Sequence, residues 1–133
     1  REIVSSQLWE VFEKNNLEPI NNFSYIKHNS STTEDIHNLD LTLQMNDEQI
    51  IINGTGNGPI DSFINGLCDK LDIDIKVADY HQSAISSGSD AKAAAYIELE
   101  KDGKTFWGVG INPNTTRASF DAIIVGLSKL LNT

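Results

Sequence analysis

An internal repeat limits the folds that this sequence can adopt. Residues sixty positions apart match in identity or in apolar character: Ile60-Asp61 with Phe120-Asp121, Phe63-Ile64 with Ile123-Ile124, and Gly66-Leu67 with Gly126-Leu127. The expected elements follow the same order twice, three strands and then a helix. The sequence therefore predicts an α+β fold, a duplicated βββα unit whose antiparallel sheets carry helices on one face. Such sheets leave other apolar surface to bury, so we expect the domain to pair as a dimer.

Repeat one, about residues 20–71, is expected to open with a strand over Ile20–Lys27 and a polar loop over His28–Asp35. Ile36–Met45 alternates leucine or methionine with polar residues, which is typical of a half-buried strand. After a turn, Glu48–Asn53 is expected to return antiparallel. Apolar residues at helical spacing then predict a helix over Pro59–Leu71.

Repeat two, about residues 72–131, contains one ambiguous segment. The alanines of Ala91–Glu100 favour a helix, whereas the alternation of side chains and the hairpin signal after it favour a strand. We predict a strand. Within the preceding strand, strict alternation puts Val77 and Tyr80 on opposite faces. The other expected elements are strands over Asp72–Ala84 and Thr105–Ile111 and a helix over Thr115–Leu131.

The N-terminal segment differs from the rest of the chain. It begins with Arg1 and is expected to form a short helix over Ser5–Lys14, which would be marginal on its own. We interpret residues 1–18 as a helical linker from a preceding subdomain and 19–133 as one domain. The sequence is thus expected to be a fragment of a longer protein.

A glycine-rich segment, Asn53–Gly58, joins the third expected strand to the first long helix. It predicts a turn in which several positions take positive φ. Pro59 suits the first helical position and Asp61 the helix N-terminus, where free backbone N–H groups can bind an anion. The nucleotide-binding fingerprints fail, because Pro59 replaces the third glycine and no Gly-Lys-Ser/Thr follows. A capped turn and a carboxylate site both remain open.

Small residues near this turn suggest a pocket. Ala84, Ala91 and Ala93 lie close in sequence to Val77 and Tyr80, and small side chains leave room for a ligand. A zwitterionic amino acid with an aliphatic side chain would suit such a pocket, with its carboxylate on the N–H groups. A sheet interior filled by neighbouring side chains would give the same pattern.

Composition excludes several classes of function. The net charge is −9 and Lys and Arg form no cluster, which argues against nucleic acid as a partner. No apolar run is long enough to span a membrane. The single cysteine, Cys68, cannot form an internal disulfide, and a reduced, cytoplasmic location fits.

Catalytic and metal-binding patterns are weak. His81 lies near Asp79 and Asp90, but no paired His or Cys spacing supports a metal site. His28 and His37 are expected to be solvated. No nucleophile motif is present, so we expect no catalytic residue, no metal and no cofactor.

Four ordered motifs resemble the C-terminal regulatory domain of 2-isopropylmalate synthases, and the resemblance covers about residues 20–131. The motifs are Asn53–Asp61, Asp79–Ala84, Gly88–Tyr96 and Phe106–Ile111. The resemblance implies that a (β/α)8 barrel of the same chain, absent from this sequence, joins acetyl-CoA to 2-oxoisovalerate with a divalent metal, the first committed step of leucine synthesis. It implies that this domain forms a homodimer and binds leucine near the interface for feedback inhibition, without catalysis of its own.

The resemblance also carries over candidate leucine-contacting residues, which are Gly56, Asn57, Gly58, Ile60, Asp61, Val77, Tyr80, Ala84, Ala91 and Ala93. The turn of repeat two, Asn112–Thr116, departs from the glycine-rich form, so its role in binding stays open. Two other interpretations remain. The domain could sense isoleucine in a citramalate synthase, which carries a related domain, or it could be purely a dimerisation domain.

Overall fold

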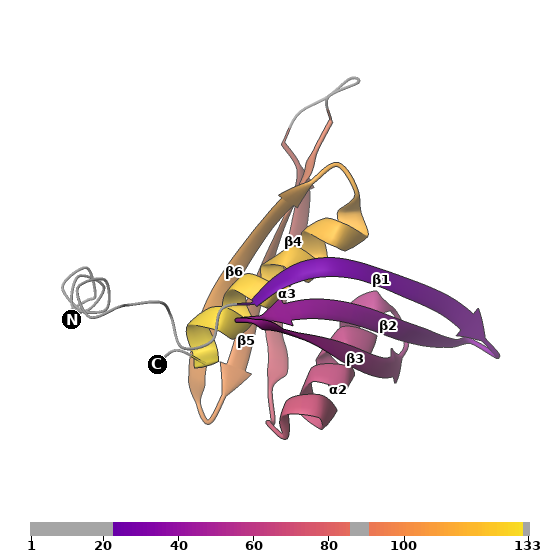
Figure 1. Cartoon of the computed structure of the whole chain (residues 1–133). Coiled ribbons are helices and arrows are strands. Elements are labelled where there is room, and N and C mark those ends of the chain that lie inside the picture. Colours follow the sequence, from indigo (N-terminus) through magenta and orange to yellow (C-terminus); the bar gives the residue numbers. More distant parts are fainter. Residues whose placement is uncertain (1–22, 86–90, 132–133) are drawn as a thin grey trace.

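The computed structural model describes residues 23–85 and 91–131, which form two three-stranded antiparallel sheets and two helices (Figure 1). Repeat one contains β1 (Phe23–Thr33), β2 (Ile36–Met45), β3 (Glu48–Gly56) and α2 (Pro59–Leu71). Repeat two contains β4 (Lys76–Ala84), β5 (Ala93–Lys101), β6 (Lys104–Asn112) and α3 (Thr115–Leu131). The duplicated βββα arrangement is confirmed. The expected helix over Ser5–Lys14 and the linker over residues 1–18 lie outside the described residues.

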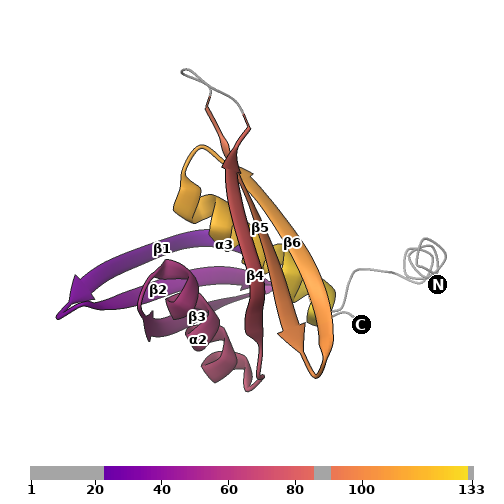
Figure 2. The ribbon, with the colours of Figure 1, turned by 180° about the vertical axis from the view of Figure 1, so that it is seen from behind.

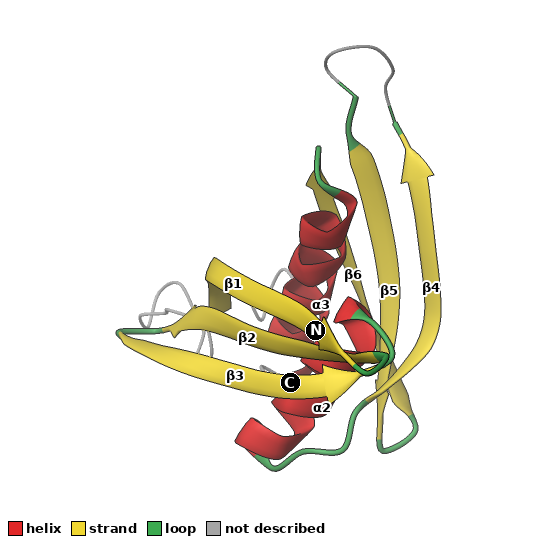
Figure 3. Ribbon diagram, turned by 90° about the vertical axis from the view of Figure 1, so that its right-hand side faces the viewer, coloured by secondary structure: helices red, strands yellow, loops and turns green. Residues whose placement is uncertain are grey.

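The two sheets, β1-β2-β3 and β4-β5-β6, share a core built on the helices. α2 packs on β3 and β2, whereas α3 packs on β5 and β6 and also reaches β1. α3 therefore lies between the two sheets, as Figures 2 and 3 show. The rings of Phe63 and Phe120 meet edge to face, with centroids 5.3 Å apart, where the two helices approach each other.

The glycine-rich segment is not the turn that the sequence predicts. β3 continues through it to Gly56, and among the described glycines only Gly103 has a positive φ. The first two glycines of the segment serve close packing instead. A Cβ on Gly54 would overlap the carbonyl oxygen of Ser62, and a Cβ on Gly56 would lie 2.7 Å from that of Asp61. Helix α2 therefore rests directly on the backbone of β3.

Repeat two packs in the same way. A Cβ on Gly108 would overlap the carbonyl oxygen of Ala122, and one on Gly110 would overlap that of Ala118. The helices contribute glycines as well, because Gly66 faces β3 and Gly126 faces Leu99 and Gly108. The duplication therefore extends to the contact between sheet and helix.

The predicted loop over His28–Asp35 is wrong. β1 runs to Thr33 and pairs with β2 along its length, and the chain turns at Glu34 and Asp35, which both have positive φ. The polar composition of this stretch suggested a loop. Pairing with the partly buried β2 satisfies its backbone groups and overrides that local preference.

A β-bulge corrects the faces predicted for β4. The register shifts between Val77 and Asp79, so Val77 pairs with Leu99 and Tyr80 pairs with Ile97. Both partners are buried, and Val77 and Tyr80 therefore lie on the same, inner face rather than on opposite faces. β4 also begins at Lys76, later than predicted, after α2 ends with Asp72 in the left-handed conformation.

The strand prediction for the alanine-rich segment is confirmed as β5. Ala93, Ala95, Ile97 and Leu99 are buried in the core, while Tyr96 is exposed. Burial of alternate residues beneath α3 outweighs the helical preference of the alanines. Both predicted helices, α2 and α3, have the bounds that the sequence predicts.

Candidate ligand pocket

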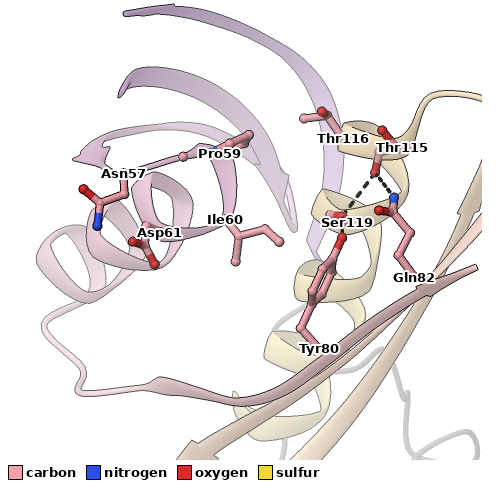
Figure 4. A pocket seen from close by; sticks show the side chains of 10 residues that line it. Asn57, Pro59, Ile60, Asp61, Tyr80, Gln82, Thr115, Thr116 and Ser119 are labelled. Carbon is pink, nitrogen blue, oxygen red and sulfur yellow. Dashed lines mark hydrogen bonds between the residues drawn. The ribbon is translucent and has the colours of Figure 1, made fainter. Parts of the chain in front are cut away.

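A cavity of about 430 Å³ opens where the two repeats meet (Figure 4). Its volume falls in the range of small-molecule sites. One side is formed by the start of α2, with Asn57, Gly58, Pro59, Ile60 and Asp61, and the other by β4 and the start of α3, with Tyr80, Gln82, Thr115, Thr116 and Ser119. The two helix N-termini thus contribute to one pocket.

The N-terminus of α2 is open toward this cavity. Its N-cap, Gly58, is extended (φ −168°, ψ −175°) and makes no side-chain capping bond, and Pro59 has no N–H. The first helical bond is made by the N–H of Ser62 to the carbonyl of Gly58 at 3.0 Å. The N–H groups of Ile60 and Asp61 thus have no acceptor within the helix, and the helix dipole favours an anion beside them.

The N-terminus of α3 is closed by its own residues. The side chain of Asn114 accepts a hydrogen bond from the N–H of Arg117 at 2.9 Å, as an N-cap does. The carbonyl of Thr115 is 3.1 Å from Ser119 Oγ and 3.3 Å from Gln82 Nε2. The two repeats therefore present unlike helix ends, and only the end of α2 lacks a side-chain cap.

A hydrogen-bonded row connects β4 to α3 along one side of the pocket. Ser119 is buried, with 3% of the residue exposed, and its hydroxyl donates its one proton to the carbonyl of Thr115. The hydroxyl of Tyr80, 3.0 Å from Ser119 Oγ, therefore donates to Ser119. This bond uses the polar end of Tyr80 and leaves its ring beside the cavity.

Two histidines of the first sheet are partly buried, so the prediction that they are solvated is wrong. His37 Nδ1 lies 3.1 Å from Ser62 Oγ, which in turn donates to the carbonyl of Gly58 at 2.7 Å. His28 is half-buried and meets Phe120 edge to face. Burial, and then the charge of Arg117, lower the pKa of His28 below its usual value.

Five of the ten candidate residues line the cavity, namely Asn57, Gly58, Ile60, Asp61 and Tyr80. Gly56 packs against the start of α2, Val77 packs against the core, and Ala93 is buried in it. Ala84 and Ala91 are exposed at the far end of β4 and before β5. The structure thus brings the turn residues and Tyr80 together and leaves the three alanines outside the lining of this cavity.

Five lining residues are absent from the candidates that the sequence suggests, namely Pro59, Gln82, Thr115, Thr116 and Ser119. Two signals could have found some of them. Gln82 follows Tyr80 by two positions in a strand, and Ser119 follows Thr115 by four in a helix, so each pair shares a face. Nothing in the sequence alone places the start of α3 beside α2.

A metal centre receives no support from the part of the chain that the structure describes. No three His, Cys, Asp or Glu residues gather there in a way that could hold an ion. His81 Nε2 lies 3.0 Å from Asp79 Oδ2, and both side chains are exposed on β4.

A sequence model of the LeuA allosteric (dimerisation) domain matches residues 2–131 of this chain. The chain belongs to this family. It is 34% identical to the 2-isopropylmalate synthase of Mycobacterium ulcerans (strain Agy99), a match over 96% of this chain and 23% of the relative. It is 35% identical to that of Mycobacterium leprae (strain TN), over 98% of this chain and 22% of the relative. It is 36% identical to the 2-isopropylmalate synthase of Thermobifida fusca (strain YX), over 96% of this chain and 22% of the relative.

The chain therefore spans less than a quarter of the length of these curated relatives. The family description, an allosteric and dimerisation domain, fits the duplicated fold and the pocket between its halves. Among the described residues, no helix has the length and apolar character needed to cross a membrane.

Proposed function

We propose that this chain is the leucine-binding regulatory domain of a 2-isopropylmalate synthase, and that leucine in the pocket lowers the activity of a catalytic part outside this sequence. The observation that carries the proposal is a cavity set against the uncapped N-terminus of α2. Family membership and the named relatives support the parent activity. The domain itself acts by binding, and its coupling to substrate binding is reciprocal: if a substrate weakens leucine binding by some factor, leucine weakens the binding of that substrate by the same factor.

The two sides of the pocket suit the two parts of an amino acid. The N–H groups of Ile60 and Asp61 would take the carboxylate, and the side chain of Asp61, which lines the cavity, would take the ammonium group. Ile60 extends from α2 toward Tyr80 and Ser119 (Figure 4), where it would contact an aliphatic side chain. This pose places the charged groups on α2 and the apolar group between the repeats.

Replacing Asp61 with Asn is expected to weaken leucine binding about tenfold or more, because a charge-assisted hydrogen bond to the ammonium contributes roughly 1.5–3 kcal/mol. Calorimetric titration of the chain with leucine measures this loss. Asp121 occupies the corresponding position in α3 and pairs with Arg117 at 3.0 Å, outside the pocket lining, so Asp121→Asn is the matched control. Equal effects of both changes would exclude a direct contact by Asp61.

The outer face of the second sheet is the surface that we assign to dimerisation. The exposed side chains of Tyr96, Trp107, Val109 and Ile111 share this face, on which Tyr96 pairs with Val109, and α3 covers the opposite face. The corresponding face of the first sheet is more polar, with Asn38, Asp40, Gln44 and Asn53 beside the exposed Ile36 and Ile51. A contiguous exposed apolar patch of this kind is typical of a protein–protein interface.

Replacing Val109 with Lys is expected to convert the dimer to a monomer, because the charge would have to be buried unpaired in the interface. Sedimentation velocity at several concentrations measures the change. Ile51→Lys, at an exposed apolar position of the first sheet, is the matched control and should leave the dimer intact. A Val109→Lys variant that still dimerises would place the interface elsewhere.

Titration of the chain with leucine, isoleucine and valine tests the proposed ligand. Saturable, leucine-selective binding supports the proposal. Isoleucine is the second candidate, because its side chain differs from that of leucine only in the position of one methyl branch, and a preference for isoleucine would favour a citramalate synthase. If none of the three binds while the chain still dimerises, a purely structural role replaces the proposed regulation.

A further inference from the structure

The two helices of the repeat differ in length at one end only. α2 has 13 residues and α3 has 17, and the last residues of both, Leu71 and Leu131, are sixty positions apart. The glycine contacts support this alignment, because Gly54 lies against Ser62 and Gly66 in repeat one as Gly108 lies against Ala122 and Gly126 in repeat two. α3 therefore starts four residues earlier, and Thr115–Ala118, here called the added turn, has no counterpart in α2.

The added turn lies beside the start of α2 and forms part of the pocket lining. Thr115 and Thr116 line the cavity from this turn, and Ser119 follows directly after it (Figure 4). In repeat one nothing equivalent projects beyond the start of α2. The difference between the two repeats therefore contributes directly to the lining of this pocket.

The added turn is held from both sheets. The guanidinium of Arg117 lies 3.7 Å from the ring centroid of Tyr25 on β1 and pairs with Asp121. On the other side, Gln82 of β4 donates to the carbonyl of Thr115, and Ala118 between these contacts is fully buried. If the added turn moved to admit a larger ligand, the contacts of Arg117 and the hydrogen bond to the carbonyl of Thr115 would be lost.

We propose that the added turn selects the ligand by size, with Thr116 limiting the room for its side chain. This inference rests on the proposed binding of an amino acid in the same pocket. Thr116 is half-buried and lines the cavity, and its side chain makes no hydrogen bond to the other described residues, so the feature on which we base its role is the space that it occupies. Thr115 is exposed and its carbonyl anchors the turn, which makes it a positioning residue.

The test compares Thr116→Ala, which enlarges the pocket, with Thr116→Val, which keeps the shape of the side chain and replaces its hydroxyl with a methyl group. The chain is titrated calorimetrically with valine, leucine, isoleucine, methionine and phenylalanine. Because one or two groups of methylene size discriminate about 10–200-fold in an apolar pocket, Thr116→Ala should raise the affinity for phenylalanine relative to leucine about tenfold. Thr116→Val should keep the wild-type order within about threefold.

The possible results distinguish a failure of the size limit at Thr116 from a failure of leucine binding itself. If the wild type binds leucine and Thr116→Ala leaves the relative affinities unchanged, the size limit is overturned and the leucine site stands. If the wild type binds none of the five amino acids, both fail. Thermal unfolding of each variant provides the control for folding, and a loss of all binding in a folded Thr116→Ala variant would also overturn a role of shape alone.

Discussion

Replacing Gly58 with valine is expected to reduce leucine affinity at least about 100-fold while the fold is retained. Gly58 lines the pocket, and a Cβ built on it meets no atom within 4 Å, so the new side chain would occupy space that the ligand needs. Its φ of −168° is extended and suits any residue. Losing two N–H contacts to a carboxylate, each a charge-assisted bond of about 1.5–3 kcal/mol, accounts for an effect of this size.

Calorimetry with leucine measures the loss, and circular dichroism shows whether the variant is folded. Thr55→Val is the matched control, because Thr55 lies two residues before Asn57, is exposed and does not line the cavity. It should bind as the wild type does. A folded Gly58→Val chain that binds leucine with unchanged affinity would move the carboxylate away from α2.

Replacing Gly108 with alanine is expected to lower the free energy of unfolding by about 3 kcal/mol, enough to unfold a marginal domain. The added Cβ would overlap the carbonyl oxygen of Ala122 and lie 2.6 Å from the backbone nitrogen of Gly126. Both atoms belong to the backbone of α3, so no side chain can rotate away. The helix would have to lift off β6, which would loosen buried residues such as Ile123 and Leu127.

Denaturation by urea, followed by circular dichroism, measures this change in stability. Gly58→Ala is the control, because its Cβ would meet nothing, and loss of the glycine N-cap should cost only about 1 kcal/mol or less. Gly54→Ala should resemble Gly108→Ala, since its Cβ would overlap the carbonyl oxygen of Ser62 in repeat one. Wild-type stability of Gly108→Ala would contradict the close contact between helix and sheet.

Much of the fold was predictable because local patterns and tertiary packing agree. Helical periodicity, with Pro59 at the start of α2, gave the bounds of both helices, and alternation gave β2 and, together with the hairpin signal after it, β5. The predicted loop over His28–Asp35 failed because its polar residues pair with β2. The prediction that Val77 and Tyr80 lie on opposite faces failed because one extra residue in β4 reverses the alternation. No pattern in the sequence marks that bulge.

The candidate pocket was predictable only on one side. The glycine-rich segment stands out in sequence because it precedes a helix, and Asp61 stands out because it lies in the first turn of that helix. Their partners across the cavity, Gln82, Thr115 and Ser119, are ordinary polar residues. They come from another repeat, and no local pattern indicates that they approach α2.

By itself, the sequence determined the βββα repeat, the two helices and the position of the glycine-rich segment, because these follow from periodicity within one element. The tertiary structure decided what the glycines do, since Gly54 and Gly108 are needed for close packing of a helix and not for a turn. It also decided that the ends of α2 and α3 meet in one pocket. The two helix ends come together because both sheets pack around α3. Such packing joins residues far apart in sequence, so no local pattern can indicate it.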